Sequence, residues 1–268
     1  MHRPTQCPLS DCLPEDVAIA LGISGNATTS SAPQGMTSEV AFVDDQDRQC
    51  VLKRCRNPIY IEWLRREHRV LVALSECALP IPRAIGYHEV RENGQVADAW
   101  LLMTRRPGES LWNVLLRSGP VERSDHFRKL GRLLRDLHST RPPKAFRTQP
   151  SWIDRKLAEA RENLAWCDGS ADLLAQLEAR RPTPQAEVLI HGDLALDNVL
   201  IERDGSMSLI DWSGGDVGDP RSDIALALAT EPEMQLRDAD IAGFFNGYGG
   251  TQIDAITARW FTRLYEFF

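Results

Sequence analysis

The sequence predicts an α+β protein of two lobes, the first mostly antiparallel sheet with one helix and the second mostly helical. Short segments rich in β-branched and aromatic residues predict the sheet, and helical periodicity dominates the later part of the chain. A Pro-Gly pair at Pro107-Gly108 follows the last strand of the first lobe. At 268 residues, the chain can form two modest domains or one large bilobal one. We expect residues 1–104 to form the first lobe and residues 105–268 the second.

The first lobe begins with a predicted β-hairpin, in which the apolar segments 39–43 and 49–53 flank a charged turn. Apolar residues then recur at spacings of three and four, which predicts an amphipathic helix over residues 59–76. Two further strands are predicted at residues 84–90 and 99–104, separated by a polar turn. Together these segments make the first lobe a sheet that carries one helix.

The second lobe is predicted to be helical around a few short strands. One apolar face marks a helix over residues 124–139, and residues 152–179 predict another helical stretch. Short apolar strands follow at residues 188–190, 199–201 and 209–210. Residues 222–268 return to a helical composition.

The composition is that of an ordinary globular protein, with 43% apolar and 26% charged residues. A net charge of −7 disfavours nucleic acid as a partner, because phosphate backbones select basic surfaces. No apolar run approaches the roughly 18 residues of a membrane span, and the first residues lack the apolar core of a signal peptide. The six cysteines lack the spacing of zinc ligands. We therefore expect a cytoplasmic protein with reduced thiols and neither a membrane nor a nucleic-acid partner.

The segment with the clearest chemistry is residues 188–201, Val-Leu-Ile-His-Gly-Asp-Leu-Ala-Leu-Asp-Asn-Val-Leu-Ile. Asp193 and Asn198 lie five residues apart on a loop between strands, and Asp211 ends the hairpin that follows. These side chains can converge on one side of a strand pair. Phosphoryl transfer needs such groups, because a carboxylate must orient or deprotonate a hydroxyl and oxygen ligands must hold Mg²⁺. Taken singly, Asp193 and Asn198 are also typical of a turn.

The order His191-Gly192-Asp193, four residues, Asn198, and then Ile210-Asp211-Trp212 resembles the motif of aminoglycoside phosphotransferases and choline-kinase-like small-molecule kinases. The resemblance covers roughly residues 35–230. Protein kinases share the fold but normally carry Arg where Gly192 stands. The resemblance implies a bilobal protein-kinase-like fold, with a nucleotide-binding first lobe and a second lobe that is catalytic and binds the acceptor.

Carried over to this sequence, the resemblance implies that Asp193 is the catalytic base and that Asn198 and Asp211 hold Mg²⁺. His191 is expected to orient the loop through hydrogen bonds. Further along, the Gly-Asp-Pro segment resembles that of the family, and its Asp219 and the nearby Asp223 are expected to brace the catalytic loop.

The resemblance also implies a nucleotide site in the first lobe. Lys53 is expected to contact the α- and β-phosphates, with Glu67 as its ion-pair partner and Glu62 as the alternative partner. A surface salt bridge is the competing interpretation for Lys53 and Glu67. Gly35, Thr37 and Ser38 could offer phosphate donors in a loop that lacks the glycine pattern of protein kinases, although a plain loop fits almost as well. Adenine is expected at the backbone of Met103, Thr104 and Arg105, with Met103 either lining the pocket or lying in the core.

The resemblance implies ATP, or alternatively GTP, with Mg²⁺ and a small-molecule hydroxyl acceptor. Residues 211–240 carry eight carboxylates against two arginines, which permits an aminoglycoside-type or other cationic antibiotic as acceptor, although such a surface is often merely solvated. The alternatives are a choline-like amine, an amino alcohol, a macrolide or a sugar. The aromatic residues of the second lobe could line such a pocket or fill the core. A catalytically silent nucleotide-binding module remains the second hypothesis, and the chain could be a monomer or a homodimer.

Overall fold

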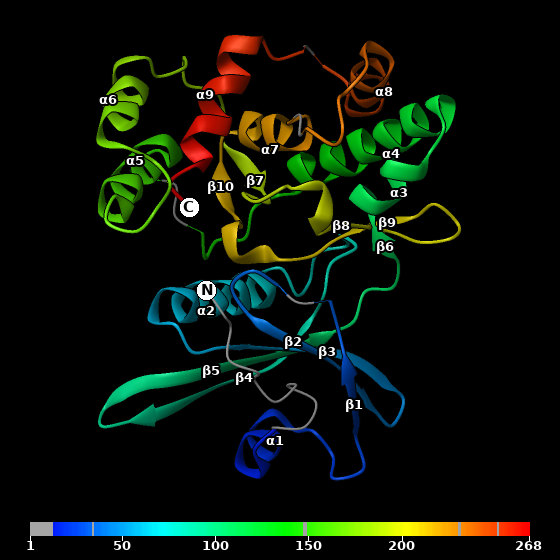
Figure 1. Cartoon of the computed structure of the whole chain (residues 1–268), viewed down its shortest axis with the longest axis vertical. Coiled ribbons are helices and arrows are strands. Elements are labelled where there is room, and N and C mark those ends of the chain that lie inside the picture. The colour runs from blue at the N-terminus through cyan, green and yellow to red at the C-terminus, as the bar shows by residue number, and fades with distance from the viewer. Residues whose placement is uncertain (1–12, 34, 147–148, 230–231, 251) are drawn as a thin grey trace. The chain divides into compact units, whose positions relative to one another are not determined.

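The computed structural model describes residues 13–33, 35–146, 149–229, 232–250 and 252–268. The chain divides into two compact units (Figure 1). Unit 1 contains the residues up to 76 together with 81–107 and 211–214, and unit 2 contains 77–80, 108–210 and 215–268. The short segment that begins at Asp211 therefore belongs to unit 1, although the sequence on both sides of it belongs to unit 2.

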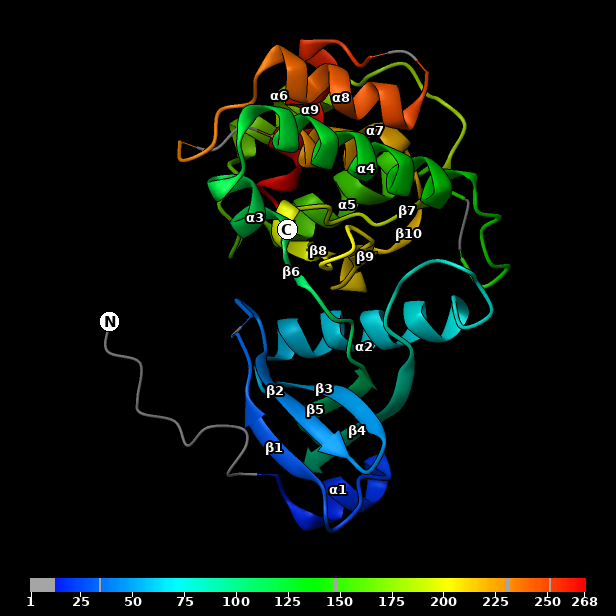
Figure 2. The same ribbon diagram turned by 90° about the vertical axis from the view of Figure 1, so that its right-hand side faces the viewer.

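Unit 1 is a five-stranded antiparallel sheet in the order β1-β2-β3-β5-β4, with α1 on one face and α2 on the other (Figure 2). Its elements are α1 (Glu15–Leu21), β1 (Thr28–Ser31), β2 (Glu39–Asp45), β3 (Arg48–Cys55), α2 (Pro58–Ala73), β4 (Ala84–Glu92) and β5 (Gln95–Thr104). The predicted hairpin is confirmed, because β2 pairs with β3 from Glu39 opposite Arg54 to Asp45 opposite Arg48. The predicted amphipathic helix is α2, whereas α1 and β1 were not predicted.

Strand alternation decides which side chains of β3 face α2. Cys50 and Leu52 pack with Val17 and Leu21 of α1 in one buried cluster. Successive side chains of a strand point to opposite faces, so Lys53 and Cys55 lie on the other face, where α2 packs. The sheet thus directs a lysine toward the buried side of a helix.

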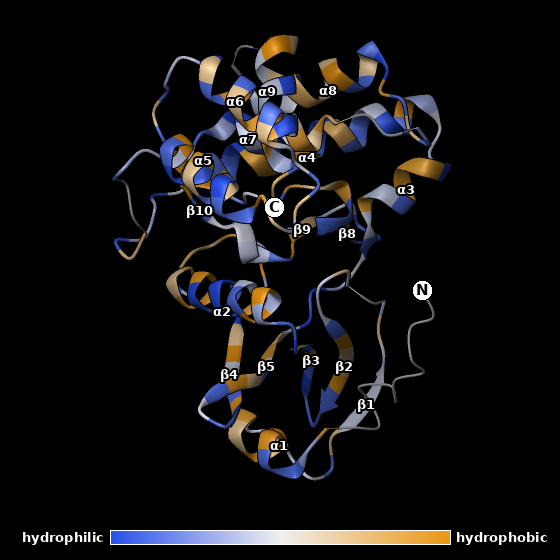
Figure 3. Cartoon of the chain, turned by 60° about the vertical axis from the view of Figure 1, so that its left-hand side comes forward, coloured by the Kyte–Doolittle hydropathy of each residue, from blue (hydrophilic) through white to orange (hydrophobic). Residues whose placement is uncertain are grey.

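Helix α2 begins at a capped N-terminus and buries one side. The Asn57 side chain accepts a hydrogen bond from the Ile59 N–H at 3.0 Å, and Pro58 occupies the first helical turn, where no N–H is needed. The banded hydropathy of the helix marks it as amphipathic (Figure 3). Its buried residues are Ile61, Leu64, Glu67, Val70 and Leu71. Glu67 is therefore the one carboxylate on an otherwise apolar face.

Unit 2 is helical around two small antiparallel sheets, β7 with β10 and β6 with β8 and β9. Its helices are α3 (Leu111–Arg117), α4 (Pro120–Ser139), α5 (Trp152–Asn163), α6 (Ala171–Ala179), α7 (Pro220–Ala227), α8 (Asp238–Tyr248) and α9 (Ala255–Tyr265). Its strands are β6 (Glu109–Ser110), β7 (Val188–Ile190), β8 (Val199–Ile201), β9 (Met207–Leu209) and β10 (Asp216–Gly218). The predicted helical stretch over residues 152–179 proves to be two helices rather than one, because the chain turns between α5 and α6.

Two of the helices in unit 2, α4 and α8, pack backbone to backbone. A Cβ atom added at Gly131 of α4 would lie 2.1 Å from the Phe244 carbonyl oxygen. One added at Gly247 of α8 would lie 1.9 Å from the Arg128 carbonyl oxygen. Because both positions lack a side chain, the backbones of the two helices can approach each other closely.

Two predictions from composition can be compared with the described residues. No helix in the described ranges is long and apolar enough to cross a membrane. Cys50, Cys55, Cys77 and Cys167 carry free thiols, while Cys7 and Cys12 lie outside the described residues.

Candidate active site

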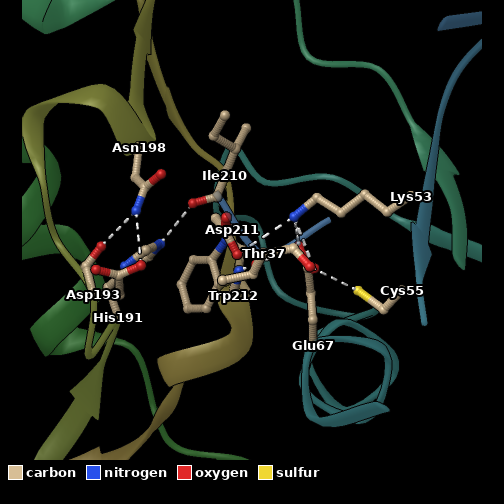
Figure 4. A network of polar contacts seen from close by, with 10 residues as sticks. All are labelled: Thr37, Lys53, Cys55, Glu67, His191, Asp193, Asn198, Ile210, Asp211 and Trp212. Atoms are coloured by element: carbon tan, nitrogen blue, oxygen red, sulfur yellow. Dashed lines mark hydrogen bonds and ion pairs between the residues drawn. The ribbon is translucent and has the colours of Figure 1, made fainter. Parts of the chain in front are cut away.

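In unit 1, a lysine lies between two carboxylates. Lys53 Nζ is 2.9 and 2.8 Å from the two carboxylate oxygens of Glu67 and 3.4 Å from Asp211 Oδ1 (Figure 4). The Trp212 N–H also donates to Glu67 Oε1 at 3.4 Å. The predicted Lys53–Glu67 ion pair is thus confirmed. Glu62, the alternative partner, instead pairs with arginines of its own helix.

The electrostatics of this cluster keep the lysine charged. Burial by itself would lower the pKa of Lys53, but the charges of Asp211 and Glu67 outweigh burial and raise the pKa above its ordinary value. Burial raises the pKa of Glu67, which is 1% exposed, and the nearby Lys53 ammonium opposes that rise. The cluster therefore places a fixed positive charge beside one partly exposed carboxylate, since the Asp211 side chain is 37% exposed.

Asp211 has an unusual backbone conformation. Its φ of 63° lies in the left-handed region, which Asp tolerates better than most residues with a side chain. The strand β9 ends just before it, and a short 3-10 turn, Trp212–Gly214, follows it. At this sharp turn of the backbone, the Asp211 carboxylate points toward Lys53 (Figure 4). A left-handed backbone conformation in a residue with a side chain is often found at functional positions.

The residues of the predicted nucleotide loop lie at and beside a small hollow that Lys53 also lines. Ser38 and Thr37 line a small hollow together with Lys53 and Asp211. Gly35 lies against Ser38, because a Cβ atom at Gly35 would be 3.2 Å from the Ser38 hydroxyl oxygen. Ser38 thus lies near the charged cluster, and Gly35 contacts that part of the loop.

The predicted adenine-contact residues lie at the end of β5. Met103 is 2% exposed in the strand, opposite Val51 of β3. Arg105 donates its backbone N–H to the Gln49 carbonyl, and its guanidinium lies over the Phe42 ring. Met103 is therefore a buried core side chain, and its backbone lies between β3 and β4 in the sheet.

In unit 2, a hydrogen-bonded Asp–Asn pair occupies the loop after β7. Asn198 Nδ2 donates to Asp193 twice, at 2.9 Å to the carbonyl oxygen and at 3.0 Å to Oδ2 (Figure 4). The 3-10 turn Leu196–Asn198 brings Asn198 back toward Asp193. This arrangement directs the Asn198 amide nitrogen to Asp193 and leaves its carbonyl oxygen available as a ligand.

A buried carboxylate of α7 anchors the loop after β7. Asp223, 0% exposed, accepts hydrogen bonds from the His191 N–H at 2.7 Å and the Gly192 N–H at 2.8 Å. The His191 ring donates from Nε2 to the Ile210 carbonyl at 2.9 Å, so it holds the loop to the hairpin that follows. Gly192 has a φ of 78°, which favours glycine. The expected bracing roles of His191 and Asp223 are confirmed.

The expectation for Asp219 is wrong. Its carboxylate accepts from the Arg221 backbone at 3.0 Å and pairs with the Arg221 guanidinium at 2.9 and 2.6 Å. Asp219 is the N-cap of α7, and an Asp at this position satisfies the first N–H groups of a helix. It therefore stabilises the start of α7 rather than the loop.

Three side chains make contacts at this site that were not predicted from the sequence. The His138 ring donates from Nε2 to Asp223 at 3.2 Å and accepts at Nδ1 from the Tyr248 hydroxyl at 2.9 Å. The Tyr265 hydroxyl donates to Asp193 Oδ1. Each of these contacts joins residues that are 72 or more positions apart in the chain. The local sequence pattern around each residue therefore gives no signal of its partner.

Internal partners take up much of the acidic charge between residues 211 and 240. Asp216 pairs with Arg155 at 2.9 Å, and Asp240 pairs with Arg237 and Arg123. Asp219 and Asp223 are also bound internally, whereas Glu233 and Asp238 are exposed. Most of the second lobe's aromatic residues fill its core, among them Trp152, Phe244, Trp260, Phe261 and Phe267.

Oxygen ligands suited to Mg²⁺ are present at two of the predicted positions. The Asp211 carboxylate and the Asn198 amide oxygen are hard oxygen donors of the kind that Mg²⁺ selects. Mg²⁺ sites of kinases use one or two such protein ligands and complete the shell with phosphate oxygens and water. Among the described residues, no group of three or more His, Cys, Asp or Glu could hold a metal ion.

Known proteins resemble this chain in sequence and in fold. The model of the phosphotransferase enzyme family matches residues 28–260. The aminoglycoside 3'-phosphotransferase of Streptomyces fradiae is 28% identical over 231 residues, which are 78% of this chain and 77% of that protein. A crystal structure of a type VIII aminoglycoside-3'-phosphotransferase has a TM-score of 0.72 at 24% identity and covers 95% of this chain and 98% of that one. A spectinomycin phosphotransferase in complex with ADP and spectinomycin has a TM-score of 0.60 at 14% identity, covering 93% and 82%. The predicted α+β kinase-like fold is confirmed.

Proposed function

This chain belongs to the phosphotransferase enzyme family, and on that premise we propose that it transfers the γ-phosphate of ATP to a hydroxyl group of a small molecule. The observation that carries this proposal is the fixed carboxylate of Asp193, held by Asn198 on a loop that Asp223 anchors. A base must be positioned before its pKa matters; here Asn198 holds the carboxylate, and two hydrogen bonds to Asp223 hold the backbone of the loop.

In the proposed mechanism, Asp193 accepts a hydrogen bond from the acceptor hydroxyl. The hydroxyl oxygen forms the new bond to the γ-phosphorus while the bond to the bridging oxygen breaks, and the proton passes to Asp193 late in the transfer. Asn198 restrains rotation of the carboxylate, and Asp223 holds the backbone of His191 and Gly192 that precedes it. Their contribution is positional, since precise orientation accounts for much of the rate of such a reaction.

We assign nucleotide binding to unit 1. Lys53 would contact the α- and β-phosphates, and Glu67 holds its ammonium in place. Ser38 and Gly35 would contribute loop donors, and the backbone of Met103 and Arg105 would meet the adenine. Asp211 and Asn198 would hold Mg²⁺, which when bound offsets the charge of the phosphates. GTP is the alternative nucleotide.

We propose an aminoglycoside-type acceptor as the first candidate. Its support is the relative named aminoglycoside 3'-phosphotransferase, which matches 78% of this chain. The acidic stretch from residue 211 to 240 adds no support, because arginines neutralise several of its carboxylates. A choline-like amine, an amino alcohol, a macrolide or a sugar is the alternative acceptor.

The test is a direct search for the phosphorylated product. Purified protein is incubated with Mg²⁺-ATP, and in parallel with Mg²⁺-GTP, and a panel of aminoglycosides, macrolides, amino alcohols and sugars. Mass spectrometry then identifies any compound that gains one phosphate. We expect Asp193→Asn to bind nucleotide normally and to lower turnover by about 10²- to 10⁴-fold, the usual contribution of a general base. Asp211→Ala is expected to weaken Mg²⁺-dependent nucleotide binding as well as turnover.

Two outcomes separate this proposal from a silent nucleotide-binding module. A product absent from the Asp193→Asn control identifies an enzyme and its substrate together. Normal nucleotide binding without any product from the whole panel favours the silent module. Full activity in Asp193→Asn would show that another group serves as the base.

A further inference from the structure

The Tyr265 hydroxyl occupies one oxygen of the proposed base. It donates to Asp193 Oδ1, while Asn198 donates to Asp193 Oδ2. Both carboxylate oxygens therefore already hold a hydrogen-bond donor from the protein. Each carboxylate oxygen can accept two hydrogen bonds, so an acceptor hydroxyl displaces the Tyr265 hydroxyl when it approaches Asp193 Oδ1 from the side that Tyr265 now covers.

The end of α9 is held so that Tyr265 stays at this position. Leu264 is buried beside it, and the Gly169 N–H donates to the Glu266 carbonyl at 3.0 Å. The Asn163 side chain donates to the Phe267 carbonyl at 2.8 Å. Phe267 is 0% exposed, and its ring fills the space that a side chain at Gly169 would need. The contact is therefore built into the packing of unit 2.

The Tyr265 side chain itself remains accessible. It is 38% exposed, in contrast to the buried Phe261 and Leu264 of the same helix. A partly exposed ring can change rotamer without opening the core, whereas the helix that carries it is fixed. The hydroxyl can thus leave Asp193 while the backbone stays in place.

We propose that Tyr265 caps the catalytic base until an acceptor hydroxyl displaces it, and that the cap restrains transfer of phosphate to water. This inference rests on the proposed function. In the uncapped enzyme, a water oxygen forms the bond to the γ-phosphorus, the bond to the bridging oxygen breaks, and the water proton goes to Asp193. The products are ADP and inorganic phosphate. Tyr265 is a positioning residue in this scheme, because it acts through Asp193.

The first test measures phosphate release from Mg²⁺-ATP without any acceptor. Tyr265→Phe keeps the ring and removes only the hydroxyl, so we expect release about ten-fold faster than in the wild type, the ratio set by a net hydrogen bond of about 1.4 kcal/mol. Tyr87→Phe, in unit 1, also removes a hydroxyl that donates to a carboxylate, that of Glu89, and is expected to match the wild type. Combining Tyr265→Phe with Asp193→Asn is expected to return release to the level of Asp193→Asn.

A second test detects the contact without any turnover. In protein labelled with fluorotyrosine, the ¹⁹F resonance missing from Tyr265→Phe identifies Tyr265. We expect that resonance to shift in Asp193→Asn and to stay unchanged in Asp204→Asn, which alters an exposed turn. An unmoved resonance in Asp193→Asn would overturn the cap.

The two proposals fail in different ways. The cap is overturned if Tyr265→Phe releases phosphate no faster than the wild type, or if its faster release persists without Asp193. In that case, phosphorylation of an acceptor by the wild type would still stand. The proposed transfer itself fails if nucleotide does not bind. It also fails if the ¹⁹F resonance shows the Tyr265–Asp193 contact but neither phosphate release nor product formation depends on Asp193 in any variant. In both cases the proposed cap fails as well.

Discussion

Asp223→Ala offers a sharp test of how the catalytic loop is held. The carboxylate accepts from two consecutive backbone N–H groups, those of His191 and Gly192, and from the His138 ring. It is 0% exposed, so its removal leaves these donors away from bulk solvent. The variant would leave both N–H groups buried without an acceptor.

The expected loss of stability follows from those contacts. A buried donor without an acceptor costs about 1–3 kcal/mol, which gives about 2–6 kcal/mol for two of them. Removing the carboxylate also removes the cost of burying its charge, so we expect the lower part of the range, about 2–4 kcal/mol. Turnover is expected to fall as well, because Gly192 precedes the base. Nucleotide binding, assigned to unit 1, is expected to remain.

The assay is urea unfolding followed by tryptophan fluorescence, with nucleotide binding measured in parallel. For a urea dependence of about 3 kcal/mol per molar, the midpoint should fall by about 1 M. Asp204→Ala is the matched control, because Asp204 also accepts a backbone N–H, at 2.9 Å from Ser206, but in an exposed turn. Equal midpoints and equal turnover in the two variants would refute the anchoring role of Asp223.

Two further predictions concern unit 2. Burial lowers the pKa of His126 and outweighs the opposing charge of Glu122, whose carboxylate lies 3.6 Å from His126 Nε2, so protonation favours the unfolded chain. Relative to His126→Phe, the wild type should therefore lose free energy of unfolding as the pH falls below about 6.5, by up to about 1.4 kcal/mol per pH unit. A constant difference between the urea midpoints of the two proteins from pH 8 to 5 would contradict this. Gly247→Ala would place a Cβ atom 1.9 Å from the Arg128 carbonyl, so we expect a loss of about 1–3 kcal/mol or more in thermal unfolding. Gly119→Ala, where nothing lies within 4 Å of the added atom, is the control, and equal melting temperatures would show that the α4–α8 contact can yield.

The sequence was sufficient where the signal was local. Spacings of three and four along α2 placed Glu67 on the buried face of that helix, and the family resemblance paired it with Lys53. The ion pair forms. The loop motif likewise brought Asp193 and Asn198 together, since they are only five residues apart and a single turn joins them. The seven-residue helix α1 was missed because so short a segment shows little periodicity.

Only the tertiary structure decided which distant side chains complete the site. His138, Tyr248 and Tyr265 lie on helices whose local patterns show only which face is buried, and the partners of a buried polar group depend on how those helices pack. The partners of charged side chains also depend on packing. Composition predicted the acidic stretch after residue 211, but not the ion pairs that Arg155 and Arg123 form with its carboxylates. Residue type and spacing thus determine the elements and the local motif. Contacts between elements far apart in the chain are decided by the packing that satisfies all of their buried groups at once.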